Sequence, residues 1–347
     1  MQRPLVYGGF PRLPALSTAE GKPGLQPSCT RNSRSLWAAY HFHLTLRQTH
    51  METRQRSVNR LLTLVVVLAL LSVALYLRTF RLNWDENHYL HPDERFLAMV
   101  GEAVERPANF RQYLDTASSP LSPYNRGYAD FFYGTLPLFL TRYVGQWASQ
   151  ACADPPALLP LAFVRLLRPA AEVCNWGPYT SYDNVSLVGR FLAALADVGA
   201  LVFIFLIGRR LYDVRVGILA LALGTFAVFP IQHSHFFAVD NFAAFFVVVA
   251  LYFSIRAVQM GQWQDFALAG LAGGLALSCK MSTWPIGLII GLAALCYITL
   301  TPRESRRWGT IGLLSRVCLA AVLFFVAFRL AHPYSFMGPG FFGLRLN

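Results

Sequence analysis

The run Leu61-Leu-Thr-Leu-Val-Val-Val-Leu-Ala-Leu-Leu-Ser-Val-Ala-Leu-Tyr-Leu77 decides the fold class of this chain. It holds no charged residue and approaches the roughly 20 residues that an α-helix needs to cross a bilayer. Similar runs follow it, and the whole sequence is 55% hydrophobic and only 14% charged, whereas soluble domains are about 25% charged. The sequence therefore predicts an all-α polytopic membrane protein, built as a bundle of transmembrane helices.

The apolar runs predict the positions of the membrane spans. They lie at about 61–78, 186–208, 216–233, 240–258, 264–279, 285–300 and 311–331. Between the first two spans lies a long loop, at about 79–184. Within it, 92–105 and about 128–150 are expected to form amphipathic helices at the membrane interface, the second one being aromatic and interrupted by Gly134 and Pro137. The apolar face expected for 92–105 comprises Phe96, Met99, Val100, Ala103 and Val104.

Arginines mark one set of loops. They occur at positions 54, 56 and 60, at 209, 210 and 215, at 256, and at 303, 306, 307 and 316. The positive-inside rule places such loops in the cytoplasm, so the 79–184 loop is expected on the extracytoplasmic face, most simply of a prokaryotic plasma membrane. This pattern accounts for the net charge of +12 without a nucleic-acid partner.

Residues 1–50 differ from the rest of the chain. They are rich in Pro, Gly, Ser and Arg and lack both a sustained apolar period and a signal-peptide core. We expect them to be disordered, or to be an extension that precedes a natural start at Met51. A genuine cytoplasmic tail is the alternative. The transmembrane module is then 51–347.

The stretch Asn83-Trp-Asp-Glu-Asn-His-Tyr-Leu-His-Pro-Asp-Glu-Arg-Phe96 concentrates ionisable side chains beside the end of the first span. Pro92 suits the first position of a helix, and carboxylates in the first turn interact favourably with the helix dipole. A carboxylate here can also accept a proton from an acceptor hydroxyl, or hold a divalent cation on a phosphate. The candidate catalytic residues are Asp93, Glu94, Asp85 and Glu86. The alternative is that Asp93 and Glu94 only favour helix initiation.

Metal ligands and phosphate-binding groups are expected nearby. His91 and His88 are candidate ligands for Mg²⁺ or Mn²⁺, although interfacial hydrogen bonding is the commoner fate of such histidines. A second ionisable group, His233, His235 and Asp240, should reach the same membrane face, and ionisable residues at this depth suggest function. Candidate groups for a donor phosphate are Lys280, Asp240, His235 and Arg95. Helix capping by Asp240 and snorkelling by Lys280 are the structural alternatives.

Two pairings are suggested by position. Arg190 and Asp197 lie on one face of the second span and are expected to pair. Cys152 and Cys174 share the long loop, where a disulfide is compatible with an extracytoplasmic location, but sequence spacing does not establish their proximity.

Several segments resemble one enzyme family, the GT-C fold glycosyltransferases that use a phospholipid-linked sugar, such as protein O-mannosyltransferases and aminoarabinose transferases. The segments are Asp93-Glu-Arg-Phe-Leu-Ala-Met-Val100, Gly208-Arg-Arg-Leu-Tyr-Asp-Val-Arg-Val-Gly-Ile-Leu-Ala220, the glycine-rich Gly270 to Lys280, Tyr133-Gly-Thr-Leu-Pro137 and His332-Pro-Tyr334. The likeness covers about 60–347. Family enzymes usually carry more spans, so the abrupt end at Asn347 indicates a C-terminally truncated member.

The resemblance implies a function. A carboxylate in the first outer loop, here Asp93 with Glu94 beside it, would assist attack by an acceptor hydroxyl or amine on the anomeric carbon of a polyprenyl-phosphate sugar, commonly with inversion. Lys280 would face the departing phosphate. Expected partners are the lipid-linked sugar, the bilayer, and an acceptor protein or glycolipid. The alternative is a non-catalytic membrane protein, such as a transporter or an inactive assembly subunit or fragment.

Overall fold

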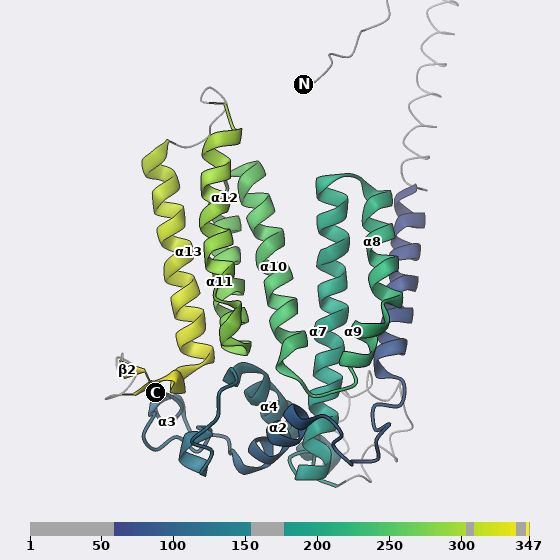
Figure 1. Ribbon diagram of the computed structural model, residues 1–347, viewed down its shortest axis with the longest axis vertical. Helices are drawn as coiled ribbons and strands as arrows, with labels where there is room; N and C mark the ends of the chain where they lie inside the picture. The colour runs from purple at the N-terminus through teal and green to yellow at the C-terminus, as the bar shows by residue number, and fades with distance from the viewer. Residues whose placement is uncertain (1–58, 154–176, 303–308, 338–344, 347) are drawn as a thin grey trace, which may run out of the picture. The chain divides into compact units, whose positions relative to one another are not determined.

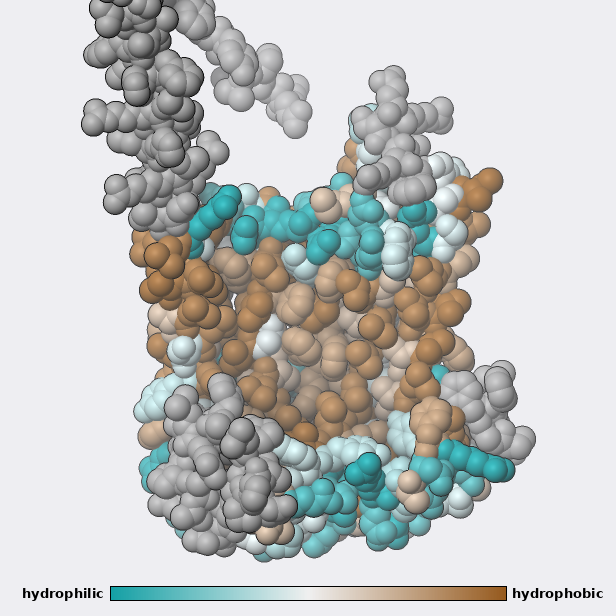
Figure 2. Space-filling model, turned by 180° about the vertical axis from the view of Figure 1, so that it is seen from behind, coloured by the Kyte–Doolittle hydropathy of each residue, from teal (hydrophilic) through white to brown (hydrophobic). Residues whose placement is uncertain are grey.

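Long apolar helices make up most of the computed structural model, which describes residues 59–153, 177–302, 309–337 and 345–346. Five helical segments are long and apolar enough to cross a membrane: Asn59–Thr79, α7 (Tyr182–Leu211), α10 (Val239–Met260), Met281–Leu300, which contains α12 (Ile286–Leu300), and α13 (Thr310–Ala331). Figure 2 shows hydrophobic residues as a broad band between two hydrophilic ends. The prediction of an all-α polytopic membrane protein is confirmed.

The segment predicted as one span at 216–233 forms two helices. α8 (Val214–Phe226) and α9 (Val228–His233) meet at Ala227, whose backbone is extended. Arg78 is fully buried beside this break, and its guanidinium donates hydrogen bonds to the carbonyl oxygens of Gly224 (2.9 Å) and Thr225 (3.1 Å). These carbonyls lie in the last turn of α8 and have no helical N–H partner of their own. Arg78 thus stabilises the C-terminal end of α8, which lies earlier in the chain than the predicted end of the span.

Arg78 also pairs with Asp197 of α7. The prediction that Asp197 pairs with Arg190 is therefore wrong. The reason is that Arg78 approaches α7 from the first helix, whereas Arg190, about two turns away, faces the outer loop. Apolar residues complete the contact of the first helix with α7 and α8: Ala74, Leu201, Phe205 and Leu221 are all buried there.

α11 (Trp263–Cys279) packs against both α10 and α13. Its glycines allow the backbones to approach closely. A Cβ atom added at Gly270 would lie 2.2 Å from the carbonyl oxygen of Ala320, and one at Gly274 would lie 2.1 Å from that of Phe324. Small residues at such contacts are common where membrane helices associate. With 17 residues α11 is shorter than the five long segments, so a membrane crossing by α11 stays a prediction.

A layer of short helices covers one end of the bundle (Figure 1). It contains α2 (Pro92–Ala103), α3 (Phe110–Leu114), a 3₁₀ turn at Tyr124–Arg126 and α4 (Thr135–Ala153). Its core joins buried residues of α2 and α4 to the start of α10: Leu97, Val100, Leu138, Phe139, Phe237 and Phe242. After α13 a 3₁₀ turn at Pro333–Ser335 leads to β1 (Phe336–Met337), which pairs antiparallel with β2 (Arg345–Leu346).

Two details of the loop helices differ from expectation. The buried side of α2 includes Leu97, whereas Met99, assigned to the apolar face, is 43% exposed. α2 packs against both α4 and α7, so its buried face is set by two contacts rather than one. The second loop helix begins at Thr135 rather than near 128, and Gly134, just before it, docks on the end of α11 through its N–H and the carbonyl of Cys279.

The chain direction alternates as the arginine pattern predicts. Beside the α2–α4 layer lie the ends of the first helix, α11 and α13, together with the starts of α7 and α10 (Figure 1). The turn between α7 and α8, with Arg209, Arg210 and Arg215, lies at the opposite end. The residues of the outer loop thus share one end of the bundle with Asp240 and Lys280. Which membrane face that end meets stays a prediction.

Substituting Gly274 tests the packing of α11. In Gly274→Ala the new methyl group would collide with backbone of α13, and such overpacking costs about 1–3 kcal/mol. The matched control is Gly291→Ala on α12, where no atom lies within 4 Å of the added Cβ and removing a helical glycine gains up to about 1 kcal/mol. Thermal unfolding in detergent should show a lower Tm for the first variant only. Equal Tm changes would contradict this packing.

Candidate active site

Arg190 of α7 is the most completely bonded charged side chain at the end of the bundle that carries the α2–α4 layer. Its guanidinium is 1% exposed, and its two carboxylate partners are fully buried at the side chain. Nε and Nη2 donate to Glu94 at 2.6 and 2.8 Å, and Nη1 and Nη2 donate to Asp85 at 2.8 Å each. The remaining Nη1 hydrogen bond goes to the carbonyl of Leu82 at 2.7 Å. All five N–H donors of the guanidinium are therefore used.

The two carboxylates extend this network to further segments. Glu94 Oε1 also accepts from the backbone N–H of Phe237 at 2.8 Å, and Asp85 Oδ2 accepts from that of Tyr89 at 3.1 Å. Burial opposes ionisation of Asp85, but the hydrogen bonds and charge of Arg190 outweigh burial and lower the pKa of Asp85. α2, α7, the Asp85 loop and the start of α10 are thus joined through one guanidinium.

The loop that carries Asp85 has an unusual backbone. Positive φ values, between 50° and 67°, occur at four of its residues: Arg81, Glu86, Asn87 and Tyr89. Residues other than glycine rarely adopt this backbone conformation, which costs about 1–3 kcal/mol per residue. Such a conformation persists only where surrounding contacts determine it. Here the bonds of Asp85 to Arg190 and Tyr89 supply those contacts.

Asp93 lies next to Glu94 in the first turn of α2 but in a different environment. It is half-buried and lies close enough to the hydroxyl of Tyr133 to affect the pKa of that phenol. Burial raises the pKa of Tyr133, and the nearby charges of Asp93 and Asp240 raise it further. Tyr133 is thus a neutral donor between two acidic side chains.

The close approach of Gly134 to α11 places Tyr133. The N–H of Gly134 donates to the carbonyl of Cys279 at 3.1 Å, and a Cβ at Gly134 would lie only 2.0 Å from the carbonyl oxygen of Ser278. Only glycine permits this contact, because every other side chain would displace the loop. Tyr133 is therefore fixed beside the residue that follows Cys279, which is Lys280.

Lys280 and Asp240 form an ion pair. The Nζ–Oδ1 distance is 2.5 Å, and both side chains are 41% exposed. Asp240 lies in the first turn of α10, and Lys280 follows the last residue of α11. Asp93, Tyr133, Asp240 and Lys280 are called the Asp93 cluster below. It combines two carboxylates, a buried phenol and a cation at one end of the bundle.

The predicted histidines occupy different positions. His91 packs against His233 and Phe236, with ring centroids 6.4 and 4.9 Å apart, and His233 lies within electrostatic range of Asp240 and Lys280. His91 and His233 therefore border the Asp93 cluster. The exposed His88 approaches the carbonyl of Asp85 at 2.7 Å. His235 approaches the carbonyls of Ile231 and Phe80 at 2.8 and 2.9 Å.

The other predicted site residues lie outside the cluster. Glu86 is exposed, and the exposed Arg95 donates to the carbonyl of Tyr89 at 3.2 Å. Asp85 and Glu94 face Arg190. Among the described residues, no group of three or more His, Cys, Asp or Glu side chains is arranged to hold a metal ion. Metal binding by His88 and His91 stays a prediction.

Sequence reasoning did not identify two contributors. Tyr133 could have been noticed because it precedes a glycine in an aromatic loop, but its proximity to Asp93, forty residues earlier in the chain, could not be predicted. Arg190 carried a stronger signal, since an ionisable residue inside an apolar span usually has a specific partner. Cys152 is disulfide-bonded, and its expected partner, Cys174, lies outside the described residues.

Replacing Arg190 should destabilise the packing of α2 and the Asp85 loop on α7. Arg190→Gln leaves two buried carboxylates without their cation, and breaking a buried pair in this way costs about 3–5 kcal/mol. The control is Arg126→Gln, whose partner Glu105 is 61% exposed and whose loss should cost at most about 1 kcal/mol. Thermal unfolding in detergent compares the two. An unchanged Tm for Arg190→Gln would refute the structural role of this network.

The same network predicts an acid dependence. The pKa of Asp85 is lower in the folded protein than in the unfolded chain, so its pairing stabilises the fold above the unfolded pKa of about 3.9. This contribution disappears as pH falls through the folded pKa. Between pH 5 and pH 3 the Tm of the wild type should therefore fall more steeply than that of Arg190→Gln. Parallel Tm curves would show that Arg190 does not lower the pKa of Asp85.

Comparison with known proteins agrees with this architecture. Residues 181–331, from the start of α7 to the end of α13, match the sequence model of the dolichyl-phosphate-mannose-protein mannosyltransferase family. A comparison with curated proteins gives no significant match. The matched region contains Arg190, Asp240 and Lys280, whereas Asp93 and Tyr133 precede it. This match supports a membrane glycosyltransferase of the GT-C type.

Proposed function

We propose that this protein transfers a sugar from a polyprenyl-phosphate donor to a hydroxyl or amine of an acceptor on the extracytoplasmic face. The observation that carries the proposal is the Asp93 cluster, in which a half-buried carboxylate and an exposed lysine share one end of the bundle. Transfer from a phosphate needs both a group that accepts a proton and a cation that stabilises the departing phosphate. Asp93 and Lys280 supply these two functions.

Each residue of the cluster has a role in the proposed reaction. The acceptor oxygen or nitrogen forms a bond to the anomeric carbon, its proton passes to Asp93, and the bond from that carbon to the phosphate oxygen breaks. The electron pair of that bond leaves on the polyprenyl phosphate, whose charge Lys280 stabilises. Tyr133, whose hydroxyl is close to Asp93, orients the Asp93 carboxylate. Asp240 holds Lys280 in place before the donor binds.

Glu94 and Asp85 receive a positioning role in this proposal. Both oxygens of each carboxylate accept hydrogen bonds from Arg190, so neither carboxylate can turn toward the cluster without a loss of that pairing. Their effect on transfer would come through the orientation of α2, and hence of Asp93. Glu86 is exposed and has no such connection to the cluster.

A divalent cation remains part of the proposal. Carboxylate oxygens are the protein ligands that Mg²⁺ and Mn²⁺ prefer, and Asp93 and Asp240 are the carboxylates nearest the expected phosphate. His88 and His235 engage backbone carbonyls instead.

If the reaction needs a cation, removing it with a chelator should abolish transfer without unfolding the protein, and unchanged transfer would show that Lys280 suffices.

Two observations support an extracytoplasmic site. The disulfide of Cys152 lies in the loop layer, and disulfides persist in oxidising compartments. The arginines of the α7–α8 turn lie at the opposite end, as expected for the cytoplasmic side. A transporter would place its ionisable groups near the membrane midplane, whereas the Asp93 cluster lies at one end of the helices. The cluster therefore favours an enzyme over the transporter alternative.

Asp93→Asn should abolish most of the transfer while leaving the fold intact. Loss of a general base typically reduces the rate by about 10²–10⁴-fold. The assay measures transfer from a radiolabelled polyprenyl-phosphate sugar in membranes, with Asp130→Asn, an exposed carboxylate of the same loop, as the matched control. Equal transfer by wild type and Asp93→Asn would disprove catalysis by Asp93. No transfer by any of the three would favour a non-catalytic role.

A further inference from the structure

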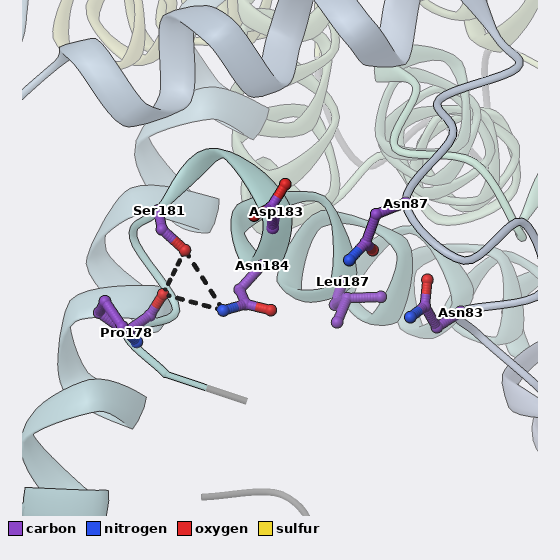
Figure 3. A pocket seen from close by; sticks show the side chains of 7 residues that line it. All are labelled: Asn83, Asn87, Pro178, Ser181, Asp183, Asn184 and Leu187. Carbon is purple, nitrogen blue, oxygen red and sulfur yellow. Dashed lines mark hydrogen bonds between the residues drawn. The ribbon is translucent and has the colours of Figure 1, made fainter. Parts of the chain in front are cut away.

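A pocket of about 420 Å³ opens at the start of α7, on the side of the Asp85 loop (Figure 3). Its volume lies in the range of about 300–1,000 Å³ found for small-molecule sites. Figure 3 shows Asn83 and Asn87 on one side, Ser181 and Pro178 on the other, and Asn184 and Leu187 between them. Asp183 completes the lining. None of these residues belongs to the Asp93 cluster.

The lining has the chemistry of a site for a neutral, hydroxyl-rich ligand. Three carboxamides and one hydroxyl can each donate and accept hydrogen bonds, and the exposed Asp183 can accept from two neighbouring hydroxyls. Leu187 adds a buried apolar surface for the C–H face of a sugar ring. Among the described residues that line the pocket there is no lysine, arginine or histidine. A phosphate bound here would therefore face only the negative charge of Asp183.

One wall of the pocket is fixed before any ligand binds. The Asn184 amide donates to the carbonyl of Pro178 at 3.3 Å and to Ser181 Oγ at 3.2 Å, while Ser181 Oγ donates to the same carbonyl at 2.8 Å. Asn184 Nδ2 is thus held by protein atoms, and Figure 3 shows Oδ1 on the side of Leu187 and Asn87. Preorganised polar groups of this kind reduce the ordering cost of binding.

The opposite wall carries two amide groups whose hydrogen-bonding capacity is not fully used. The side-chain oxygens of Asn83 and Asn87 are buried and have no hydrogen-bond partner among the described residues. An unpaired buried acceptor is unfavourable and usually indicates a missing partner. Rotation of either amide about its last bond exchanges its oxygen and nitrogen, so a hydroxyl-bearing ligand in the pocket can offer each amide a hydrogen-bond partner.

We propose that this pocket binds saccharide units of the acceptor, remote from the reacting hydroxyl or amine. The acceptor role rests on the proposed function, whereas saccharide binding itself does not. Asn83 and Asn87 flank Asp85, which is bonded to Arg190 and through it to Glu94 beside Asp93. A saccharide held here would therefore contact the same loop that the Arg190 network ties to α2.

Saccharide binding is tested with the full-length protein in detergent, using mannotriose as the probe and ligand-detected saturation-transfer NMR as the measurement. The variant Asn83→Ala/Asn87→Gly removes both amides while glycine keeps the positive φ at position 87. Binding should weaken about tenfold, because two hydrogen bonds are lost. The matched control is Gln232→Ala, which removes an exposed amide at the same end, beside a different pocket. Asp183→Asn, at an exposed position, tests the pocket if the double variant does not fold.

The outcomes separate this proposal from the proposed function. Unchanged binding in both the double variant and Asp183→Asn, or no mannotriose binding to wild type, would overturn the pocket assignment. Tighter binding of a serine-containing tripeptide than of mannotriose would overturn the ligand class. Asp93→Asn should bind mannotriose as wild type does, so a failed transfer assay leaves saccharide binding standing. If binding stands, the double variant should raise the acceptor KM with little change in kcat, and an unchanged KM would overturn the acceptor role.

Discussion

The ion pairs of Arg190 are the interaction on which the end of the bundle with the α2–α4 layer depends. One guanidinium from a membrane helix satisfies two carboxylates and a carbonyl, and those groups belong to the Asp85 loop and to the first turn of α2. A buried ion pair is not in itself strongly stabilising, because desolvation offsets most of the attraction. Its value here is positional: with every donor and most acceptors used, α2 has one orientation relative to α7. The strained backbone around Asp85 is maintained by the same contacts.

The site joins parts of the chain that differ in their relation to the mannosyltransferase family. The family match begins at α7 and so supplies Arg190, Asp240 and Lys280, while Asp93 and Tyr133 come from the preceding loop. Two contacts bring these parts together. The Arg190 pairs fix α2 on α7, and the glycine at position 134 lets the aromatic loop sit on the end of α11. The proposed chemistry therefore needs both the membrane helices and the loop layer.

Much of the fold could be predicted from the sequence, since apolar runs and arginine spacing are local signals. The start of α2 followed from Pro92 and the acidic first turn. The division of 216–233 into α8 and α9 could not be predicted, because it depends on Arg78 reaching carbonyls almost 150 positions away. For the site, the sequence named four carboxylates and the resemblance favoured Asp93 with Glu94 beside it, but the sequence did not predict which partner each carboxylate meets. Glu94 and Asp93 are neighbours in sequence, yet they point about 100° apart on a helix, one toward Arg190 and the other toward Tyr133. Only the packing of α2 shows this difference.

The most direct test of the account is a structure of the protein with a polyprenyl-phosphate sugar bound. In that structure we expect the phosphate to displace Asp240 from Lys280 and to accept a hydrogen bond from Nζ, and the anomeric carbon to lie beside the Asp93 carboxylate. The Arg190 pairs with Glu94 and Asp85 should remain unchanged. A donor whose phosphate binds away from Lys280, or whose sugar lies nearer to Glu94 than to Asp93, would contradict the central claim.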